Sequence, residues 1–258
     1  MADSVQDGLV QAAQVIREAA VRETANGVHY AEFGDNTLDS KELERMVQAV
    51  PVTIAGALAR KTYYFVPLAL SESRGSEGTV VASAYTAEIA DQAICHRNVS
   101  MGERDGVFIS TRLLGDRFAL AFEFFINVGH AFVDAAGVPD AFNQLVWGQA
   151  LADVRGETSQ DAWESRSLAL TNNGKTESVD GKTVIDEKAK NSFLESAFSD
   201  AVAIYQLSLS VDFDYSELRE REYPLLAPQG LAERLRLAAK LFPPNPGYEF
   251  SIRYRRRA

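Results

Sequence analysis

Residues 112–137 read RLLGDRFALAFEFFINVGHAFVDAAG, and this stretch decides the fold class. Apolar side chains occupy nearly every face that a helix of this sequence would present, and a glycine closes the stretch. A helix that is apolar on almost all sides must be covered. Four polar residues, Glu123, Asn127, His130 and Asp134, interrupt the apolar run and disfavour a membrane span. The stretch therefore predicts a long helix in the core of a soluble domain.

The segments before and after this helix predict an α+β fold that is rich in helix. Residues 61–70 and 79–85 are rich in aromatic and β-branched side chains, and a polar turn with glycine separates them, which favours a hairpin. Residues 106–111 (GVFIST) resemble a further strand, and residues 248–254 alternate apolar and polar side chains, as a half-buried strand does. We expect these strands to form one small, mainly antiparallel sheet that packs against the helices.

The length of 258 residues and the hydrophobic content of 46% predict a single globular domain over residues 1–258. Its expected parts are an N-terminal helical segment (1–50), a strand-rich part (61–111), a helical part (112–241) and a C-terminal strand (248–254). Further helices are expected over residues 4–25, 39–50, 86–96, 140–154, 159–170, 184–209 and 228–241. Residues 171–182 read TNNGKTESVDGK, which is typical of a loop.

The charge and the cysteine content limit the classes of partner and site. Acidic residues outnumber basic ones by 36 to 26, and a net charge of -10 repels nucleic acids and anionic membranes alike. We therefore expect neither as a partner. Cys95 is the only cysteine, so one chain can build neither an internal disulfide nor a multi-cysteine metal site. The N-terminus has no uninterrupted apolar stretch, and a soluble, acidic, cytoplasmic protein is expected.

The polar residues of the core helix are not scattered. Asp116, Glu123, Asn127, His130 and Asp134 are separated by seven, four, three and four positions, which places them on one face of a helix. A buried carboxylate costs several kcal/mol unless it is paired or hydrogen-bonded. The stripe is therefore expected to face a polar network, a water-filled cleft or a metal ion, and the spacing leaves these alternatives open.

A second acidic stripe follows at a similar spacing. Its members are Asp153, Glu157, Asp161 and Glu164, with Trp163 nearby and with Arg155 and Arg166 as partners that could neutralise part of the charge. A solvated helix face explains this pattern without any function. Alternatively, the carboxylates face His130 and together hold a divalent cation, with zinc, manganese or iron preferred because an imidazole takes part.

Two segments resemble a known family. Residues 126–130 read INVGH late in an apolar helix, which resembles the HExxH helix of zincin metallopeptidases, whose members often read HEVGH. Residues 196–205 read SAFSDAVAIY, which is similar to the downstream helix of the anthrax-lethal-factor type of zincin, approximately E-x-F-A-E-A-x-A-x-Y. The resemblance places the two histidine ligands at Ile126 and His130, the general base at Asn127 and the third ligand at Ser196.

The resemblance implies the fold of a zincin and denies its activity. A catalytic zinc needs three protein ligands and a glutamate that takes a proton from the bound water. Isoleucine cannot bind zinc, serine replaces a carboxylate poorly, and asparagine cannot act as the base. We therefore expect a pseudoenzyme that binds no metal and no other cofactor, in which His130 donates a hydrogen bond to Asp134, Glu157 or a backbone carbonyl.

Three functional hypotheses follow from these observations. The first is a non-catalytic, zincin-like domain with a binding or assembly role, through a protein partner or self-association. The second is a divalent-metal-dependent hydrolase that uses His130, Asp134 and carboxylates of the second stripe. The third is a structural subunit of a larger complex, which would expose aromatic residues such as Tyr63 and Tyr64.

Two smaller candidates concern the remaining thiol and imidazole groups. Cys95 could act as a nucleophile with His130 as base and Asp134 as orienting group, although a buried, inert cysteine is the expected alternative. His29, in the segment NGVHYAEFGDN, is expected to be a surface or packing histidine.

Overall fold

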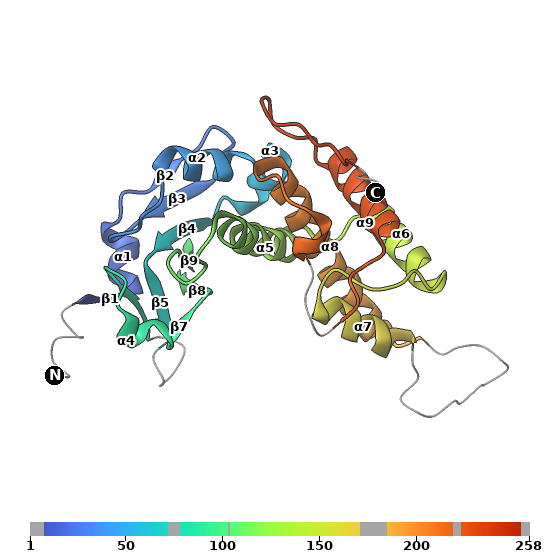
Figure 1. Cartoon of the computed structure of the whole chain (residues 1–258), viewed down its shortest axis with the longest axis horizontal. Coiled ribbons are helices and arrows are strands. Elements are labelled where there is room, and N and C mark those ends of the chain that lie inside the picture. The colour runs from blue at the N-terminus through green and yellow to red at the C-terminus, as the bar shows by residue number, and fades with distance from the viewer. Residues whose placement is uncertain (1–7, 72–77, 103, 171–184, 219–222, 254–258) are drawn as a thin grey trace. The chain divides into compact units, whose positions relative to one another are not determined.

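The computed structural model describes residues 8–71, 78–102, 104–170, 185–218 and 223–253 (Figure 1). Over this part of the chain the predicted α+β class and the abundance of helix are confirmed, and five of the seven strand pairs are antiparallel. The loop expected over 171–182 lies outside the described residues.

The chain divides into two compact units. The first contains Met1–Asn127 and Pro244–Tyr248, and the second contains Val128–Pro243 and Glu249–Ala258. Figure 1 shows that the strands belong to the blue-to-green part of the chain, whereas the yellow-to-red part is helical. The sequence predicts a single domain, and this division into units does not test that prediction.

The first unit contains a five-stranded sheet in the order β2-β3-β4-β9-β8. The strands are β2 (Arg22–Glu23), β3 (His29–Glu32), β4 (Lys61–Val66), β9 (Arg104–Ser110) and β8 (His96–Met101). The three central strands are parallel, and the outer two are antiparallel to their neighbours. A parallel centre needs cover on both faces, which explains the unbroken run of apolar side chains in β4.

Both faces of β4 are covered by helices. On one face, Tyr64 stacks on Phe108 with ring centroids 4.9 Å apart, and the cluster around them includes Val15 of α1 (Ala12–Glu18). On the other face, Tyr63 meets Phe124 of α5 (Arg117–Ala136) edge to face at 5.0 Å. Tyr63 and Tyr64 are therefore buried rather than exposed, which removes the aromatic surface that the structural-subunit hypothesis invokes.

A second, antiparallel sheet has the order β1-β6-β5-β7. Its strands are β1 (Leu9–Gln11), β6 (Thr79–Ala82), β5 (Leu68–Ser71) and β7 (Ala93–Ile94). The predicted pairing of 61–70 with 79–85 is confirmed for β5 and β6 only. Residues 61–70 do not form one strand, because the chain bends at Pro67, which has no N–H to donate to a strand ladder. As a result, β4 and β5 belong to different sheets.

The N-terminal segment is less helical than predicted. The helix expected over 4–25 is confirmed only as α1, and the strands β2 and β3 follow it before α2 (Ser40–Gln48), α3 (Val52–Ala55) and η2 (Gly56–Leu58). The start of α2 agrees with the prediction, because the Asp39 side chain accepts hydrogen bonds from the backbone of Lys41 and Glu42. The helix expected over 86–96 shrinks to α4 (Ala87–Ala90), because β7 and β8 take the residues after it.

The second unit consists of helices around α8 (Glu187–Ser210), as predicted. The others are the end of α5, α6 (Asp140–Leu151), α7 (Gln160–Leu170), η3 (Tyr215–Leu218) and α9 (Pro228–Leu241). A Cβ atom on Gly129 would lie 2.6 Å from the carbonyl oxygen of Ser199, so only glycine permits this close approach of α5 to α8. Phe132, Phe198 and Phe242 form an aromatic cluster beside the crossing.

The apolar character of α5 agrees with its place in the core. It is the one helix in the described ranges that is long and apolar enough to cross a membrane, and half of its most apolar window is buried within the protein. Its contacts with β4 and α8 require that composition in a core helix.

The strand predicted over 248–254 is wrong for residues 248–253, and residue 254 lies outside the described ranges. The segment is held by side chains instead of by a ladder. Asn245 donates to the carbonyl oxygens of Gln48 and Val50 at 2.9 and 2.7 Å, and Tyr248 donates its hydroxyl to the carbonyl of Arg45 at 2.6 Å. Alternation of apolar and polar residues was therefore not sufficient to form a strand here.

Candidate functional site

The first half of the predicted α5 stripe forms a local polar network in the first unit. Asp116 caps α5 by accepting a hydrogen bond from the Ala119 backbone at 2.7 Å. The Glu123 carboxylate lies 2.5 Å from Nδ1 of His96 on β8, and Asn127 donates to the Glu123 carbonyl at 2.8 Å. A satisfied network is one of the alternatives that the spacing left open, and it explains these residues.

The second half of the stripe is exposed. His130 and Asp134 both lie on the surface of α5, within the second unit. The hydrogen bond expected between His130 and Asp134 stays a prediction. His130 therefore does not stand in the buried position that a structural histidine of the core would occupy.

The second acidic stripe is not one helix face, which corrects the interpretation of its spacing. Helix α6 ends at Leu151, and Asp153 follows in a left-handed conformation with φ of 53°. Glu157 lies in the connection and pairs with Leu225 through an isolated bridge, whereas Asp161 and Glu164 are exposed on α7. Within the described ranges, no three histidine, cysteine or acidic side chains gather as metal ligands.

The four positions named for the zincin resemblance lie on α5 and α8. Ile126, Asn127 and His130 are on α5, and Ser196 is partly buried on α8, where its carbonyl oxygen accepts from the hydroxyl of Ser199 at 3.0 Å. The relationship to zincins stays a prediction.

Glu157 is the centre of a buried charge cluster in the second unit. Its side chain is 0% exposed, and so is that of Arg234 on α9, whose Nη1 donates to Oε2 at 2.8 Å. Arg166 of α7 donates to Oε1 at 3.1 Å, and Arg234 also donates from Nε to the Gln149 side chain at 2.8 Å. Two guanidinium groups thus compensate one carboxylate that is fully buried.

Gly156 allows the backbone to turn so that the side chain of the next residue, Glu157, enters the core. Its φ is 81°, and a Cβ atom there would lie 2.2 Å from the carbonyl oxygen of Leu225. The backbone of Glu157 then pairs on both sides, since its N–H donates to Pro224 and its carbonyl accepts from Leu226 at 2.9 Å. Glycine is therefore required for the segment that carries the central carboxylate.

Asp200 is a second buried carboxylate in this unit. Its Oδ2 accepts a hydrogen bond from the hydroxyl of Thr158 at 2.8 Å. Burial raises the pKa of Asp200 to about 6, although the hydroxyl groups of Ser159 and Thr158 and the charge of Arg234 act in the opposite direction. A carboxyl group with this pKa titrates between acidic and neutral pH.

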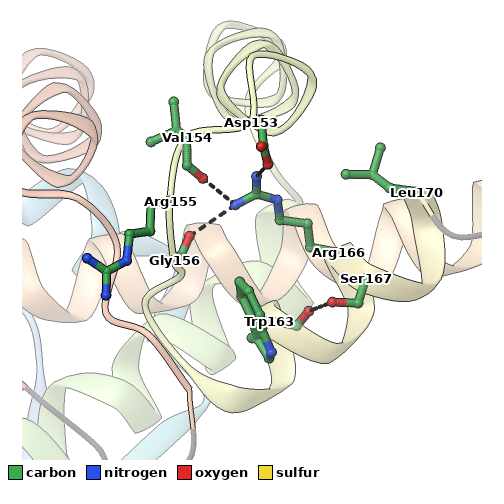
Figure 2. A pocket seen from close by; sticks show the side chains of 8 residues that line it. All are labelled: Asp153, Val154, Arg155, Gly156, Trp163, Arg166, Ser167 and Leu170. Carbon is green, nitrogen blue, oxygen red and sulfur yellow. Dashed lines mark hydrogen bonds and ion pairs between the residues drawn. The ribbon is translucent and has the colours of Figure 1, made fainter.

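A cavity of 310 Å³ opens beside the charge cluster. Figure 2 shows its wall: the segment after α6 contributes one side, and α7 contributes the other. The lining residues are Asp153, Val154, Arg155, Gly156, Trp163, Arg166, Ser167 and Leu170. Trp163 is half-buried, whereas Arg155 is exposed and forms no ion pair or side-chain hydrogen bond with the described part of the chain.

Sequence reasoning named Arg155, Trp163 and Arg166 beside the acidic stripe but missed the cavity and Arg234. The signal for the cavity was Gly156, which breaks the apparent helical spacing between Asp153 and Glu157. No local pattern connects Arg234 to Glu157, because the contact joins distant segments.

The two smaller candidates have structural explanations. Cys95 is exposed, which corrects the expectation of a buried thiol, and partial burial and the negative charge of Glu123 raise its pKa. A raised pKa lowers the thiolate fraction and disfavours a nucleophilic role. His29 is partly buried on β3, and its Nε2 lies 3.8 Å from the carboxylate of Glu23.

No protein-family model matches this chain, and no curated protein is similar to it in sequence.

Proposed function

We propose that this chain is a non-catalytic binding protein whose second unit takes a small ligand in the cavity lined by Arg155, Trp163 and Arg166. One observation carries the proposal. The cavity presents a half-buried indole ring and the buried guanidinium of Arg166, with the exposed Arg155 at its edge, while Glu157 behind it is engaged by Arg166 and Arg234. A concave site with an aromatic wall and few polar groups is the usual form of a ligand pocket.

Neither buried carboxylate of this unit is placed for acid–base chemistry, and the carboxylate in the lining, Asp153, is exposed with its Oδ1 3.7 Å from Arg166. A general base must reach the proton that it abstracts from a substrate. Glu157 is enclosed by Arg166 and Arg234, and Asp200 is buried beside Thr158. Neither group offers an accessible lone pair to a substrate in the cavity.

The degenerate motif supports the same proposal for the zincin-like helices. In the zincin resemblance, Ile126 and Ser196 stand at the positions of metal ligands, and Asn127, at the position of the general base, donates its amide hydrogen to the carbonyl oxygen of Glu123 at 2.8 Å. The acidic composition and single thiol further support a protein that works in the cytoplasm without a metal or another cofactor.

Titration calorimetry with Zn²⁺ tests whether the chain has a metal site of the kind that a metal-dependent hydrolase needs. We expect no tight one-to-one binding that depends on His130, and His130→Gln should leave the titration unchanged. His29→Gln is the matched control, since it removes another imidazole. Tight stoichiometric binding that disappears only in His130→Gln would instead support the metal-dependent hydrolase that uses His130 and Asp134.

Self-association is a second candidate, and two exposed leucines of the second unit are the positions at which it can be tested. Leu151 at the end of α6 is 62% exposed, and Leu168 on α7 is 55% exposed. Apolar side chains of this kind often mark contact surfaces when they gather in a patch. Analytical ultracentrifugation would detect a dimer, and Leu168→Lys should then shift the equilibrium towards monomer.

A further inference from the structure

We infer that this cavity binds a small organic anion with a planar, apolar body, that is, the class of aromatic carboxylates. The inference rests on the proposed function and names the ligand class of the same cavity. The anion would contact Arg166, and the planar body would lie against Trp163. The Arg155 side chain is directed away from both in Figure 2, and because it is exposed it would turn towards the anion when the ligand binds.

Arg166 supplies a buried donor that its protein partners do not use fully. Its side chain is 6% exposed, and Nη1 donates to the carbonyls of Val154 and Gly156 and to Glu157. Nη2 has only a 3.5 Å contact with the Ala150 carbonyl. Since each terminal nitrogen of a guanidinium carries two hydrogens, Nη2 retains one for an acceptor in the cavity.

Asp153 marks the place where a ligand carboxylate would lie. Its Oδ1 is 3.7 Å from Nη2 of Arg166, which is too long for a hydrogen bond, and its side chain is otherwise in solvent. A carboxylate of a bound ligand could approach Nη2 more closely than Asp153 does, because the ligand is not fixed to the backbone at that point.

The charge of the lining favours an anion over a cation. Arg155 and Arg166 contribute two positive charges and Asp153 one negative charge, so the lining is formally +1 in a chain of net charge -10. Behind the lining, Glu157, which both Arg166 and Arg234 contact, and Arg234 together add no net charge to this sum. A cation would meet the guanidinium of Arg166 in the cavity and the charge of Arg155 at its edge, whereas a carboxylate would meet one competing acid.

The other walls suit a flat apolar group. Trp163 is half-buried and offers part of its ring, with Val154 and Leu170 also in the lining. A volume of 310 Å³ corresponds to about ten water molecules at about 30 Å³ each. One aromatic ring with a short acidic side chain fits this space, and stacking on an indole ring favours such a ring over an aliphatic chain.

The experiment uses the full chain, labelled with ¹⁵N, and phenylacetate as the probe. The Trp163 indole N–H signal is identified by its persistence in Trp147→Phe. Phenylacetate should shift this signal with a dissociation constant of about 1 mM, as suits a ligand of about ten non-hydrogen atoms. The neutral phenylacetamide should bind about fivefold more weakly, and the cationic 2-phenylethylammonium should bind more weakly still.

Three variants separate the cavity from general effects of charge. Arg155→Gln should weaken phenylacetate binding about fivefold with little effect on phenylacetamide. Arg17→Gln makes the same charge change on α1 of the first unit and should alter neither. Asp153→Asn removes the competing acid and should strengthen phenylacetate binding about threefold, and asparagine tolerates the left-handed backbone at this position. Loss of folding cannot produce a gain of affinity.

The outcomes distinguish the ligand class from the proposed function. If phenylacetamide binds as tightly as phenylacetate, or if Arg155→Gln and Asp153→Asn change nothing, the anion class is wrong while the cavity remains a ligand site. If the Trp163 signal moves with none of the three probes at about 20 mM, which is far above the expected dissociation constant, both the ligand class and the proposed binding function are overturned.

Discussion

Replacing Arg234 with methionine should strongly destabilise the second unit, because it removes one partner of a fully buried ion pair. The change deletes the 2.8 and 3.3 Å contacts with Glu157 and the 2.8 Å hydrogen bond to Gln149. Breaking a buried pair on one side costs about 3 to 5 kcal/mol, since a charge is left without compensation. Arg166 still contacts Glu157 at 3.1 Å, so we expect the lower part of that range, about 3 kcal/mol.

Urea unfolding at pH 7, followed by circular dichroism, measures this loss. Arg236→Met is the matched control, since this arginine is exposed on the same helix, and its replacement should cost less than about 1 kcal/mol. In the double variant Glu157→Gln with Arg234→Met, the combined loss should be smaller than the sum of the two single losses. A loss below about 1 kcal/mol for Arg234→Met, at an unchanged dependence on urea, would refute the assignment of this cluster as the electrostatic core of the unit.

Three further predictions concern the core and its titration. Gly129→Ala should cost about 2 to 3 kcal/mol, because its Cβ meets the backbone of α8, whereas Gly148→Ala, which meets nothing within 4 Å, should be neutral or stabilising in the same urea assay. Phe125→Ala or Phe132→Ala should each cost about 3 to 5 kcal/mol, and a loss under about 1 kcal/mol at both would mean that α5 is not the core. Because burial raises the pKa of Asp200 from 3.8 to about 6, its carboxyl group is bound to a proton more tightly in the folded state than in the unfolded state. The wild type should therefore lose up to about 3 kcal/mol of stability, relative to Asp200→Asn, as the pH rises from about 4 through 6, and parallel stability curves for the two proteins would contradict this.

The predictable part of the fold is the part that depends on local periodicity. Helix α5 could be predicted from residues 112–137 because its apolar positions extend around the whole helix, and burial against β4 and α8 follows from that composition. Pro67 was visible as an interruption, but the sequence could not indicate that the strands before and after it join different sheets. Strand partners depend on contacts across the chain, which leave no periodic signal.

The candidate site shows the same division. Asp153 and Glu157 have the spacing of neighbours on a helix. Because the backbone is left-handed at Asp153 and Gly156, however, the Asp153 side chain lies in solvent and the Glu157 side chain lies in the core. The sequence by itself determined the apolar core helix, the surplus of acidic residues and the absence of an HExxH motif, because each depends on composition or on adjacent residues. Only the tertiary structure decided that Arg234 neutralises Glu157 and that Trp163 and Arg155 line one cavity, because the pairing of a buried charge is set by packing between distant segments.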